Sequence, residues 1–532
     1  MKKLLIIMFF SVPTVLVEAQ NAGTREDREA LFNYIYEKTL DREAFSDLKE
    51  QHYGIDVREE MLKVKDEVVN ASTDLELYYA LVKLSAARRD SHLDVSPIEG
   101  GLVLPEIQRG TVPIRFHPDY TDKNNVFFFV ADLAKDRSVY DGKAPSIGDE
   151  LIQVNGEPAD YYINRASEYI SCSTRENFLR RMAFGLSEKN RDLPPSFYKE
   201  NLTLTLKPKK GKEYTITLPY LNDVVWQYGR MMKDYVGYEL VSEIKRESFE
   251  VYKPTDPNNK TILLWWYGFR GDLQDASDEL VDWAEKNNML DYDLIIDAID
   301  SRGGSQGAYA LARLTSKPFK TTGGNIKLSD ITDDFIAGYT RRYVARQAAM
   351  DGDGRESEDD GTWVMDWLHG PVLKGIAAGQ EYSNNVPFKC AHLPHYSDWV
   401  MQPAEKHFTG NMVIMLGPWG GSHLSQFAAM IIDNNLGHSI GMPDGGYSNT
   451  WEWEEDLIFP ISKKPVVEFM WNIGHTISPS GQIVEGNPSQ VAEYIPVSRD
   501  NYLNYKPMLV NKAQEWLRNE KALTAVKINE KR

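Results

Sequence analysis

The chain has 532 residues, too many for one hydrophobic core, so two or three domains are expected. Hydrophobic residues make up 42% of the chain and charged residues 26%, which is the composition of an ordinary globular protein. Asp and Glu number 78 against 60 Lys and Arg, giving a net charge of -18. Because this charge repels phosphate, the composition disfavours nucleic acids and anionic membranes as partners.

The N-terminus has the pattern of a secretory signal peptide. Lys2 and Lys3 precede an apolar run from Leu4 to Val17, and small residues stand at the usual cleavage positions before Gln20. The run is shorter than the roughly 20 residues that span a bilayer, which favours a cleaved signal over an anchor. We therefore expect residues 1–19 to be removed and the mature protein to be exported, periplasmic or extracellular, without a membrane span.

Two regions of different periodicity follow. Residues 20–97 repeat apolar positions at helical spacing and are predicted to form a small helical domain. Residues 98–222 contain short strands separated by turns, including the strong hairpin signal Asn155-Gly156, and are predicted to form a β-rich domain. The expected strands are Val126–Val130, Glu150–Val154 and Leu202–Leu206.

From residue 223 to the C-terminus, strands alternate with helices. The expected strands are Thr261–Tyr267, Leu294–Ile299 and Met412–Leu416, and the expected helices are Ala308–Leu314 and Gln426–Ile432. This alternation predicts an α/β core with a largely parallel sheet. Residues 320–410 interrupt the core as a long, poorly periodic insertion.

Neither metal-like pattern in the insertion predicts a metal site. The run that begins at Asp351 resembles a calcium loop, but Glu356 and Thr362 stand where an EF-hand needs Gly and Glu. Cys390, His392 and His395 have a plausible spacing but lack a second half. The only other cysteine, Cys172, could pair with Cys390, although nothing in the sequence requires it. We expect no metal and no cofactor.

Two serines lie where a predicted strand leads into a predicted helix. Ser305, in Gly303-Gly304-Ser305-Gln306-Gly307, fits the G-x-S-x-G nucleophile elbow. Ser422 follows the strand Met412–Leu416 and begins a helix, whose dipole favours a nucleophile and a nearby oxyanion. Glycine and serine are also ordinary turn and cap residues, so neither pattern decides alone.

Several segments together resemble the tail-specific, or C-terminal processing, family of serine peptidases. Residues 297–304, Asp-Ala-Ile-Asp-Ser-Arg-Gly-Gly, resemble the family's strand end and glycine-rich turn. Ser422 precedes Phe427 by five residues and Asp433 by eleven, as in the family's nucleophile segment, whereas Ser425 does not fit.

Three further segments are similar to the same family. Asp90-Ser91-His92 resembles its Asp-Gly-His-Thr segment, residues 147–156 resemble the closing half of a PDZ-like domain, and residues 483–486 resemble its late Ile-Glu-Gly segment. Tyr447 stands where the Ser/Lys branch has its lysine. The chain therefore looks closer to the tricorn-core and chlamydial secreted protease branch, which uses Ser-His-Glu.

This resemblance implies a fold and an activity. The implied fold is a ClpP/crotonase-like α/β core (223–532) with an N-terminal helical domain and a PDZ-like domain. The implied activity is cleavage of polypeptide substrates, with Ser422 as nucleophile, His92 as base and Glu485 as third triad member. Backbone N–H groups of Gly303, Gly304 and His423 would form the oxyanion hole.

Two alternatives remain open from the sequence. The first is an α/β-hydrolase-type esterase with Ser305 as nucleophile and Asp444 and His475 as partners. The second is a catalytically inactive, peptidase-like binding protein. Its sequence hint is Gln426, which replaces the glutamate of the family's Ser-Ala-Ser-Glu signature.

Overall fold

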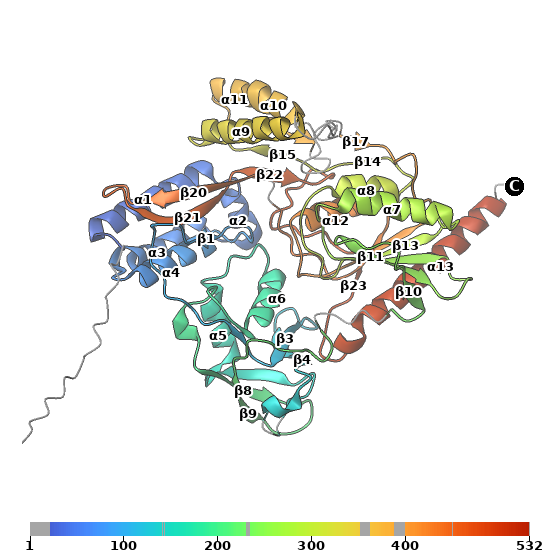
Figure 1. Cartoon of the computed structure of the whole chain (residues 1–532), viewed down its shortest axis with the longest axis horizontal. Helices are drawn as coiled ribbons and strands as arrows, with labels where there is room; N and C mark the ends of the chain where they lie inside the picture. Colours follow the sequence, from blue (N-terminus) through green and yellow to red (C-terminus); the bar gives the residue numbers. More distant parts are fainter. Residues whose placement is uncertain are drawn as a thin grey trace, which may run out of the picture.

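A computed structural model describes residues 22–140, 142, 144–229, 235–351, 362–387, 399–448 and 451–530. The chain is a mixed α/β protein with several sheets and helices (Figure 1). The expected signal peptide, most of the calcium-like run and the residues Cys390, His392 and His395 lie outside the described residues.

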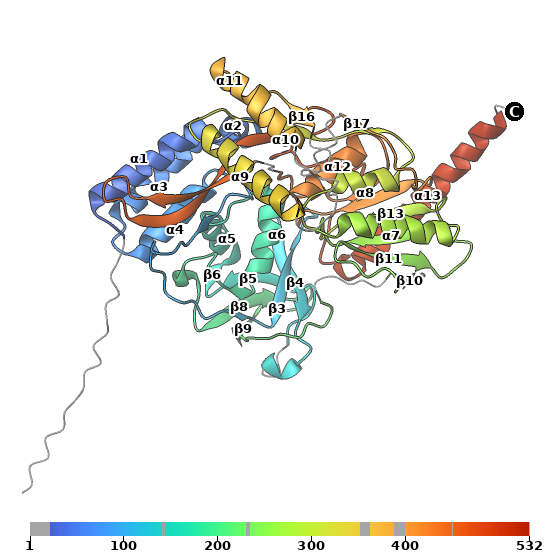
Figure 2. The same cartoon turned by 45° about the horizontal axis from the view of Figure 1, so that its top comes forward.

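The N-terminal layer consists of α1 (Arg25–Arg42), α2 (Ser46–Tyr53), α3 (Val57–Asn70) and α4 (Asp74–Ala86). The side chains of Thr24, Asp56 and Thr73 cap α1, α3 and α4 by accepting backbone N–H groups of the first turn. These helices pack against a hairpin from the far end of the sequence, β20 (Glu452–Ile458) and β21 (Pro465–Asn472). Strand β21 also pairs with β1 (Val95–Ser96), and Figures 1 and 2 show the hairpin beside the helices.

Residues after β1 form an antiparallel sheet with strand order β3-β4-β5-β8-β9. Its strands are β3 (Ile114–Asp119), β4 (Phe127–Leu133), β5 (Glu150–Val154), β8 (Asn201–Lys207) and β9 (Tyr214–Pro219), with β6 (Glu157–Pro158) paired to β5. The expected hairpin turn is present, since Asn155 and Gly156 both have positive φ, at 53° and 87°. Helices α5 (Ala159–Ser167) and α6 (Arg175–Gly185) pack beside the sheet, and β2 (Gly110–Thr111) pairs with β7 (Glu188–Lys189).

The C-terminal core is built on a sheet with strand order β10-β11-β12-β13-β18-β19-β23. Its strands are β10 (Tyr238–Leu240), β11 (Phe249–Pro254), β12 (Thr261–Trp266), β13 (Asp293–Asp297), β18 (Met412–Leu416), β19 (His438–Gly441) and β23 (Glu493–Tyr494). The strands from β12 to β23 are parallel, as expected for an α/β core.

Helices cover both faces of this sheet, which explains why its central strands are apolar throughout. Leu294 and Ile296 pack in one hydrophobic cluster with α7 (Leu273–Lys286), α8 (Gly307–Leu314) and α12 (His423–Asp433). Ile295, which points the other way, packs in a second cluster with α13 (Tyr505–Glu530) and the antiparallel sheet. Parallel strands buried on both faces lack the alternation of buried and more exposed residues that is seen in β8.

The insertion holds more regular structure than its weak periodicity indicates. It contains α9 (Thr332–Asp351), α10 (Thr362–Trp367) and α11 (Leu373–Ala377), with β14 (Phe319–Lys320), β15 (Gly323–Ile326), β16 (Val386–Pro387) and β17 (Val400–Met401). Strand β15 pairs with β22 (Gly474–Ile477). Helix α9 buries Phe335 and Ile336 near its start and exposes residues such as Val344 further along, so its apolar stripe is short.

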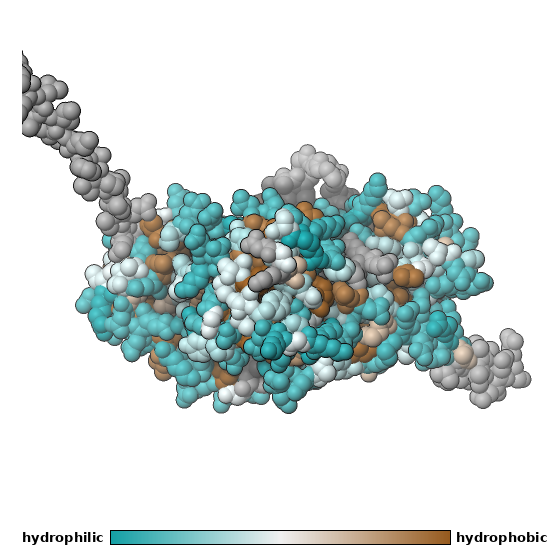
Figure 3. All heavy atoms as spheres, turned by 90° about the horizontal axis from the view of Figure 1, so that it is seen from below, coloured by the Kyte–Doolittle hydropathy of each residue, from teal (hydrophilic) through white to brown (hydrophobic). Residues whose placement is uncertain are grey.

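The surface agrees with the acidic, polar composition. The face shown in Figure 3 is mostly hydrophilic, with hydrophobic residues in small separate patches. Within the part of the chain that the structure describes, no helix is both long and apolar enough to cross a bilayer.

Candidate active site

Ser422 lies in a sharp turn between β18 and α12. Its backbone has φ 59° and ψ −128°, a region that non-glycine residues adopt at a cost of about 1–3 kcal/mol. A serine that merely caps a helix has an extended backbone and accepts an N–H of the first turn with its hydroxyl. Ser422 does neither, since its side chain makes no capping hydrogen bond. The strained strand-to-helix turn is instead the local geometry of a nucleophile elbow.

The glycine turn after β13 lies directly against Ser422. A methyl group built on Gly303 would lie 2.5 Å from Cβ and 2.9 Å from Oγ of Ser422. Phe269 ties the turn down, because its N–H donates to Gly303 and its carbonyl accepts from Ser305. Among the described residues, the N–H groups of Gly303 and Gly304 have no hydrogen-bond partner. The turn can therefore supply amide donors beside the serine hydroxyl.

The His423 side chain has a structural position. The ring is 1% exposed, its Nε2 accepts the N–H of Gly307 at 2.7 Å, and it packs edge-on against Phe269. The ring thus connects the beginning of α8 to the beginning of α12. This placement leaves only the backbone N–H of His423, in the first turn of α12, for the predicted oxyanion role.

His92 follows α4 and lies at the edge of an open cleft. Its side chain is 17% exposed, and its backbone N–H donates to the carboxylate of Asp90 at 2.9 Å. The carboxylates near its Nδ1 are Asp90 at 3.8 Å and Glu452 at 4.0 Å. Burial lowers the pKa of His92, and the nearby cations Arg181 and Lys49 lower it further, while Asp90 acts in the opposite direction.

Tyr447 connects Ser422 to His92. Its carbonyl accepts the N–H of Ser422 at 2.5 Å, and its ring covers Gly421. The His92 ring packs edge-on against the same tyrosine ring, with centroids 5.2 Å apart. Two residues 330 positions apart in the sequence therefore contact the same residue, Ser422 through the backbone carbonyl of Tyr447 and His92 through its ring. In the described structure, the Ser422 hydroxyl and the His92 ring do not form a direct hydrogen bond with each other.

Buried hydrogen bonds hold these remote segments together. Ser91 and Ser173 each donate a backbone N–H to the other's hydroxyl, at 3.0 and 2.9 Å. The amide of Asn177, in α6, donates to the carbonyls of Pro418 and Trp419 in the turn that leads to Ser422. Helix α6 thus links the His92 segment to the Ser422 turn.

Glu485 is buried but forms no hydrogen bond or ion pair with His92 in the described structure. It is 1% exposed and forms a buried ion pair with Lys49. Burial raises its pKa to about 7, with a further increase from Asp90 that the attraction of Lys49 opposes. Lys49 lies in α2, and no sequence pattern indicated that it would pair with a residue 436 positions away.

The cleft beside His92 has a volume of about 660 Å³. It is bounded by α4, α6 and the turn before Ser422, and its polar lining includes Arg181, Glu452 and Ser91. Burial, together with Asp90, raises the pKa of Glu452 to about 8, so this carboxyl is mostly protonated at neutral pH. The cleft is large enough for several residues of an extended peptide.

The three residues of the esterase alternative do not meet. Asp444 is buried and accepts the hydroxyl of Ser425 at 2.7 Å and the N–H of Gly446. His475 bonds the carbonyl of Ala44, in the N-terminal layer, at 2.7 Å. Neither residue hydrogen-bonds Ser305, whose N–H is held by Phe269. No grouping of three or more His, Cys, Asp or Glu suited to a metal ion occurs among the described residues, and Cys172 is buried and free.

Comparison with solved structures identifies proteins that share the fold of this chain. No protein-family model matches the sequence, and no curated protein matches it. The solved structure of mature CPAF has a TM-score of 0.65 at 14% identity, covering 92% of this chain and 97% of that one. Mature CPAF complexed with lactacystin gives a TM-score of 0.65 at 14% identity, with coverage of 95% and 99%. The chain therefore shares the CPAF fold over nearly its whole length.

More distant structural neighbours include the photosystem II D1 C-terminal processing protease. It has a TM-score of 0.36 at 10% identity, covering 88% of this chain and 92% of that one. A putative S41 protease from Bacteroides fragilis has a TM-score of 0.33 at 10% identity, covering 83% and 90%. These scores are too low to support an argument about residues.

Proposed function

We propose that this protein is a serine peptidase with Ser422 as nucleophile and His92 as general base. The observation that carries the proposal is the strained backbone of Ser422 at the head of α12. Strain of this kind persists where the surrounding structure holds it, and it concentrates at catalytic turns. The glycine turn on one side of Ser422 and His92 beyond Tyr447 on the other supply the two further groups that acyl transfer needs.

In the proposed reaction, the neutral His92 ring takes the hydroxyl proton as Ser422 Oγ bonds to the peptide carbonyl carbon. The oxyanion that forms accepts hydrogen bonds from the backbone N–H groups of Gly303, Gly304 and His423. The protonated ring then gives its proton to the leaving amine as the C–N bond breaks. Water attacks the acyl-enzyme by the same route and restores Ser422.

The ring of His92 must turn or move for this step, because it makes no hydrogen bond to Ser422 here. Catalytic hydrogen bonds are commonly loose in free enzymes and tighten when substrate binds. Two buried carboxylates are candidates for the third triad member. Glu485 stands at the family's position, and Asp90 lies nearer the ring.

Active-site labelling tests the proposal. The mature protein is treated with a fluorophosphonate, beside Ser422→Ala, Ser305→Ala and Ser425→Ala variants of matched thermal stability. We expect the label and the cleavage of unfolded casein to be lost in Ser422→Ala and kept in Ser305→Ala. Labelling that survives in Ser422→Ala refutes the assignment. A wild-type protein that neither reacts nor cleaves casein is the inactive binding protein instead.

We also propose that the protein is exported and that residues 98–222 form a PDZ-like domain. The support for export is the N-terminal pattern Lys2-Lys3 followed by an apolar run. N-terminal sequencing of protein recovered from the medium or periplasm should begin near Gln20. An uncleaved N-terminus in the cytosol would contradict it.

A further inference from the structure

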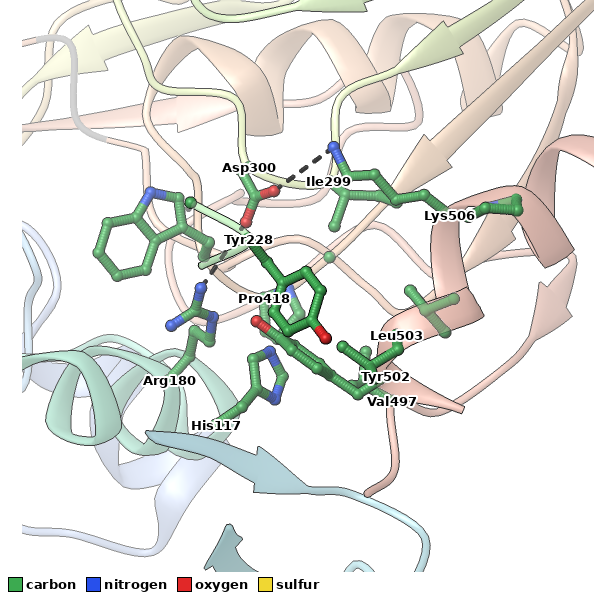
Figure 4. Close-up of a pocket in the computed structure, with 15 residues that line it drawn as sticks. His117, Arg180, Tyr228, Ile299, Asp300, Pro418, Val497, Tyr502, Leu503 and Lys506 are labelled. Carbon is green, nitrogen blue, oxygen red and sulfur yellow. Dashed lines mark ion pairs between the residues drawn. The ribbon is translucent and has the colours of Figure 1, made fainter. Parts of the chain in front are cut away.

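A second cavity, the arginine pocket, lies behind the turn that carries Ser422. Its volume is about 190 Å³, and its lining includes Arg115, Arg180, Asp300, Arg302, Tyr267 and Trp419. A smaller cavity of about 40 Å³, shown in Figure 4, adjoins it and shares Arg180, Asp300 and Trp419. The pocket lies between the antiparallel sheet with α6 and the ends of β12 and β13.

The guanidinium of Arg180 makes no hydrogen bond to a described residue. Arg180 is 9% exposed, rises from α6 and points toward Asp300 (Figure 4). Its guanidinium lies 3.8 Å from the Asp300 carboxylate and 4.9 Å from the centroid of the Trp419 ring. None of its five N–H donors has a hydrogen-bond partner among the described residues. Its side-chain nitrogens are not fully enclosed, so they can donate to an acceptor that enters the pocket.

Asp300 forms an ion pair with Arg180, but the distance of 3.8 Å is too long for a hydrogen bond. Its carboxylate also faces Lys506 at 3.7 Å, and Lys506 is itself paired with Asp297 at 2.8 Å. The described residues that line the arginine pocket include three arginines and one acidic residue, Asp300. The pocket is therefore locally cationic in a protein whose net charge is -18. An anion that enters the pocket is attracted by its arginines.

The arginine pocket adjoins the candidate active site through two residues. Arg302 directly precedes Gly303, the glycine that touches Ser422. Trp419 lies three residues before Ser422, and its ring packs edge-on against Phe184 with centroids 5.3 Å apart. Trp419 and Phe184 both line this pocket and also the cleft beside His92. Arg302 and Trp419 therefore place the pocket next to the two turns that meet at Ser422.

We infer that the arginine pocket binds a carboxylate of the substrate, namely the side chain of an Asp or Glu near the bond that is cleaved. The inference rests on the proposed peptidase function. A carboxylate matches the fork of a guanidinium and can accept two of its hydrogen bonds. Tyr267 and Trp419 cover the methylene groups of such a side chain with aromatic surface. The specificity determinant is Arg180, with Arg302 beside it.

Cleavage of matched peptides tests the inference. Casein fragments are first sequenced to locate cuts, and a peptide pair is made with Glu or Gln at the position next to the cut. We expect kcat/KM for the Glu peptide to exceed that for Gln at least about tenfold in the wild type. In Arg180→Met the two should agree within about threefold, and Arg180→Lys should recover part of the preference. Arg175→Met, on the exposed part of α6, is the matched control and should keep the wild-type ratio.

Binding to the Ser422→Ala variant separates this inference from the proposed function. Tryptophan fluorescence and calorimetry measure the binding of peptides that contain Glu or Gln. Each peptide is made with a free C-terminal carboxylate and with a C-terminal amide. Tighter binding of the Glu amide that Arg180→Met abolishes supports the pocket even if the protein cleaves nothing. Preference for the free acid regardless of side chain shows a chain-terminus site and overturns the side-chain assignment. Equal cleavage and equal binding of Glu and Gln peptides by a stable, active wild type overturn the inference entirely.

Discussion

Ser422 holds a backbone conformation that helix formation does not require. An ordinary capping serine would begin α12 with an extended backbone and would satisfy one N–H of the first turn. Here the N–H of Ser422 is instead bound by the carbonyl of Tyr447, and the Ser422 side chain packs directly against Gly303. The contacts on both sides therefore hold the strained turn, with the Ser422 hydroxyl directly against the glycine turn.

The position of His92 predicts how activity falls at low pH, the acid limb of the pH profile. The base must be neutral, so kcat/KM should fall as the pH drops through the pKa of His92. Because burial lowers that pKa, the midpoint should lie below 6.5, the ordinary histidine value. A profile of kcat/KM from pH 4 to pH 9 checks this. A midpoint above 6.5, or full activity at pH 4, would contradict His92 as the base.

Asp90 and Glu485 can be separated by substitution. Asp90 raises the pKa of His92, so Asp90→Asn should move the acid limb to lower pH and reduce kcat by about 10²–10⁴-fold. Glu485→Gln removes the partner of a buried lysine and should lower the thermal midpoint while leaving the acid limb in place. The measurements are pH profiles and thermal unfolding.

The converse result would assign the third position to Glu485. In that case Glu485→Gln abolishes kcat at unchanged thermal stability, and Asp90→Asn shows mainly a stability loss, since Asp90 also accepts a hydrogen bond from Asn472 at 2.5 Å.

At the scale of elements, the glycine turn and the head of α12 must fit each other. In Gly303→Ala the new methyl would lie 2.5 Å from Ser422 Cβ, so the serine or the turn must shift. We expect fluorophosphonate labelling and kcat/KM to fall about 100-fold or more, with a small change in thermal midpoint. Gly271→Ala is the control, because a methyl there meets nothing within 4 Å.

Gly304→Ala should behave differently from Gly303→Ala. Gly304 has φ +143°, and a methyl on it would collide with the carbonyl of Phe269, so the whole turn would be displaced. Loss of stability together with activity is expected there. Unchanged labelling in Gly303→Ala would show that the turn is not part of the site.

At the scale of the molecule, the N-terminal helices depend on residues from the other end of the chain. Their hydrophobic core includes Phe469 and Trp471 of β21, and Arg42 forms ion pairs with Asp330 and Glu455. We expect a fragment of residues 22–97 to be largely unfolded by circular dichroism and by amide exchange. A cooperatively folded fragment would show that this layer is an independent domain.

The sequence by itself determined what depends on neighbouring residues. Periodicity located β5 and β18 at their observed bounds, and Asn155-Gly156 identified a hairpin turn, whereas the choice of Ser422 over Ser425 came from the resemblance to a family and stays a prediction. Each of these signals is local, because backbone propensity and strand alternation act over a few residues.

Only the tertiary structure decided which remote side chains meet. It placed Tyr447 in contact with both Ser422 and His92, paired Glu485 with Lys49, and placed Arg180 beside Asp300 in a pocket with two further arginines. It also added β20 and β21 to the N-terminal layer. Apart from the contact of Tyr447 with Ser422, these contacts join residues more than a hundred positions apart, and their free energy comes from burial in a shared core. No pattern within either segment encodes that partner, because the partner is chosen when the elements pack.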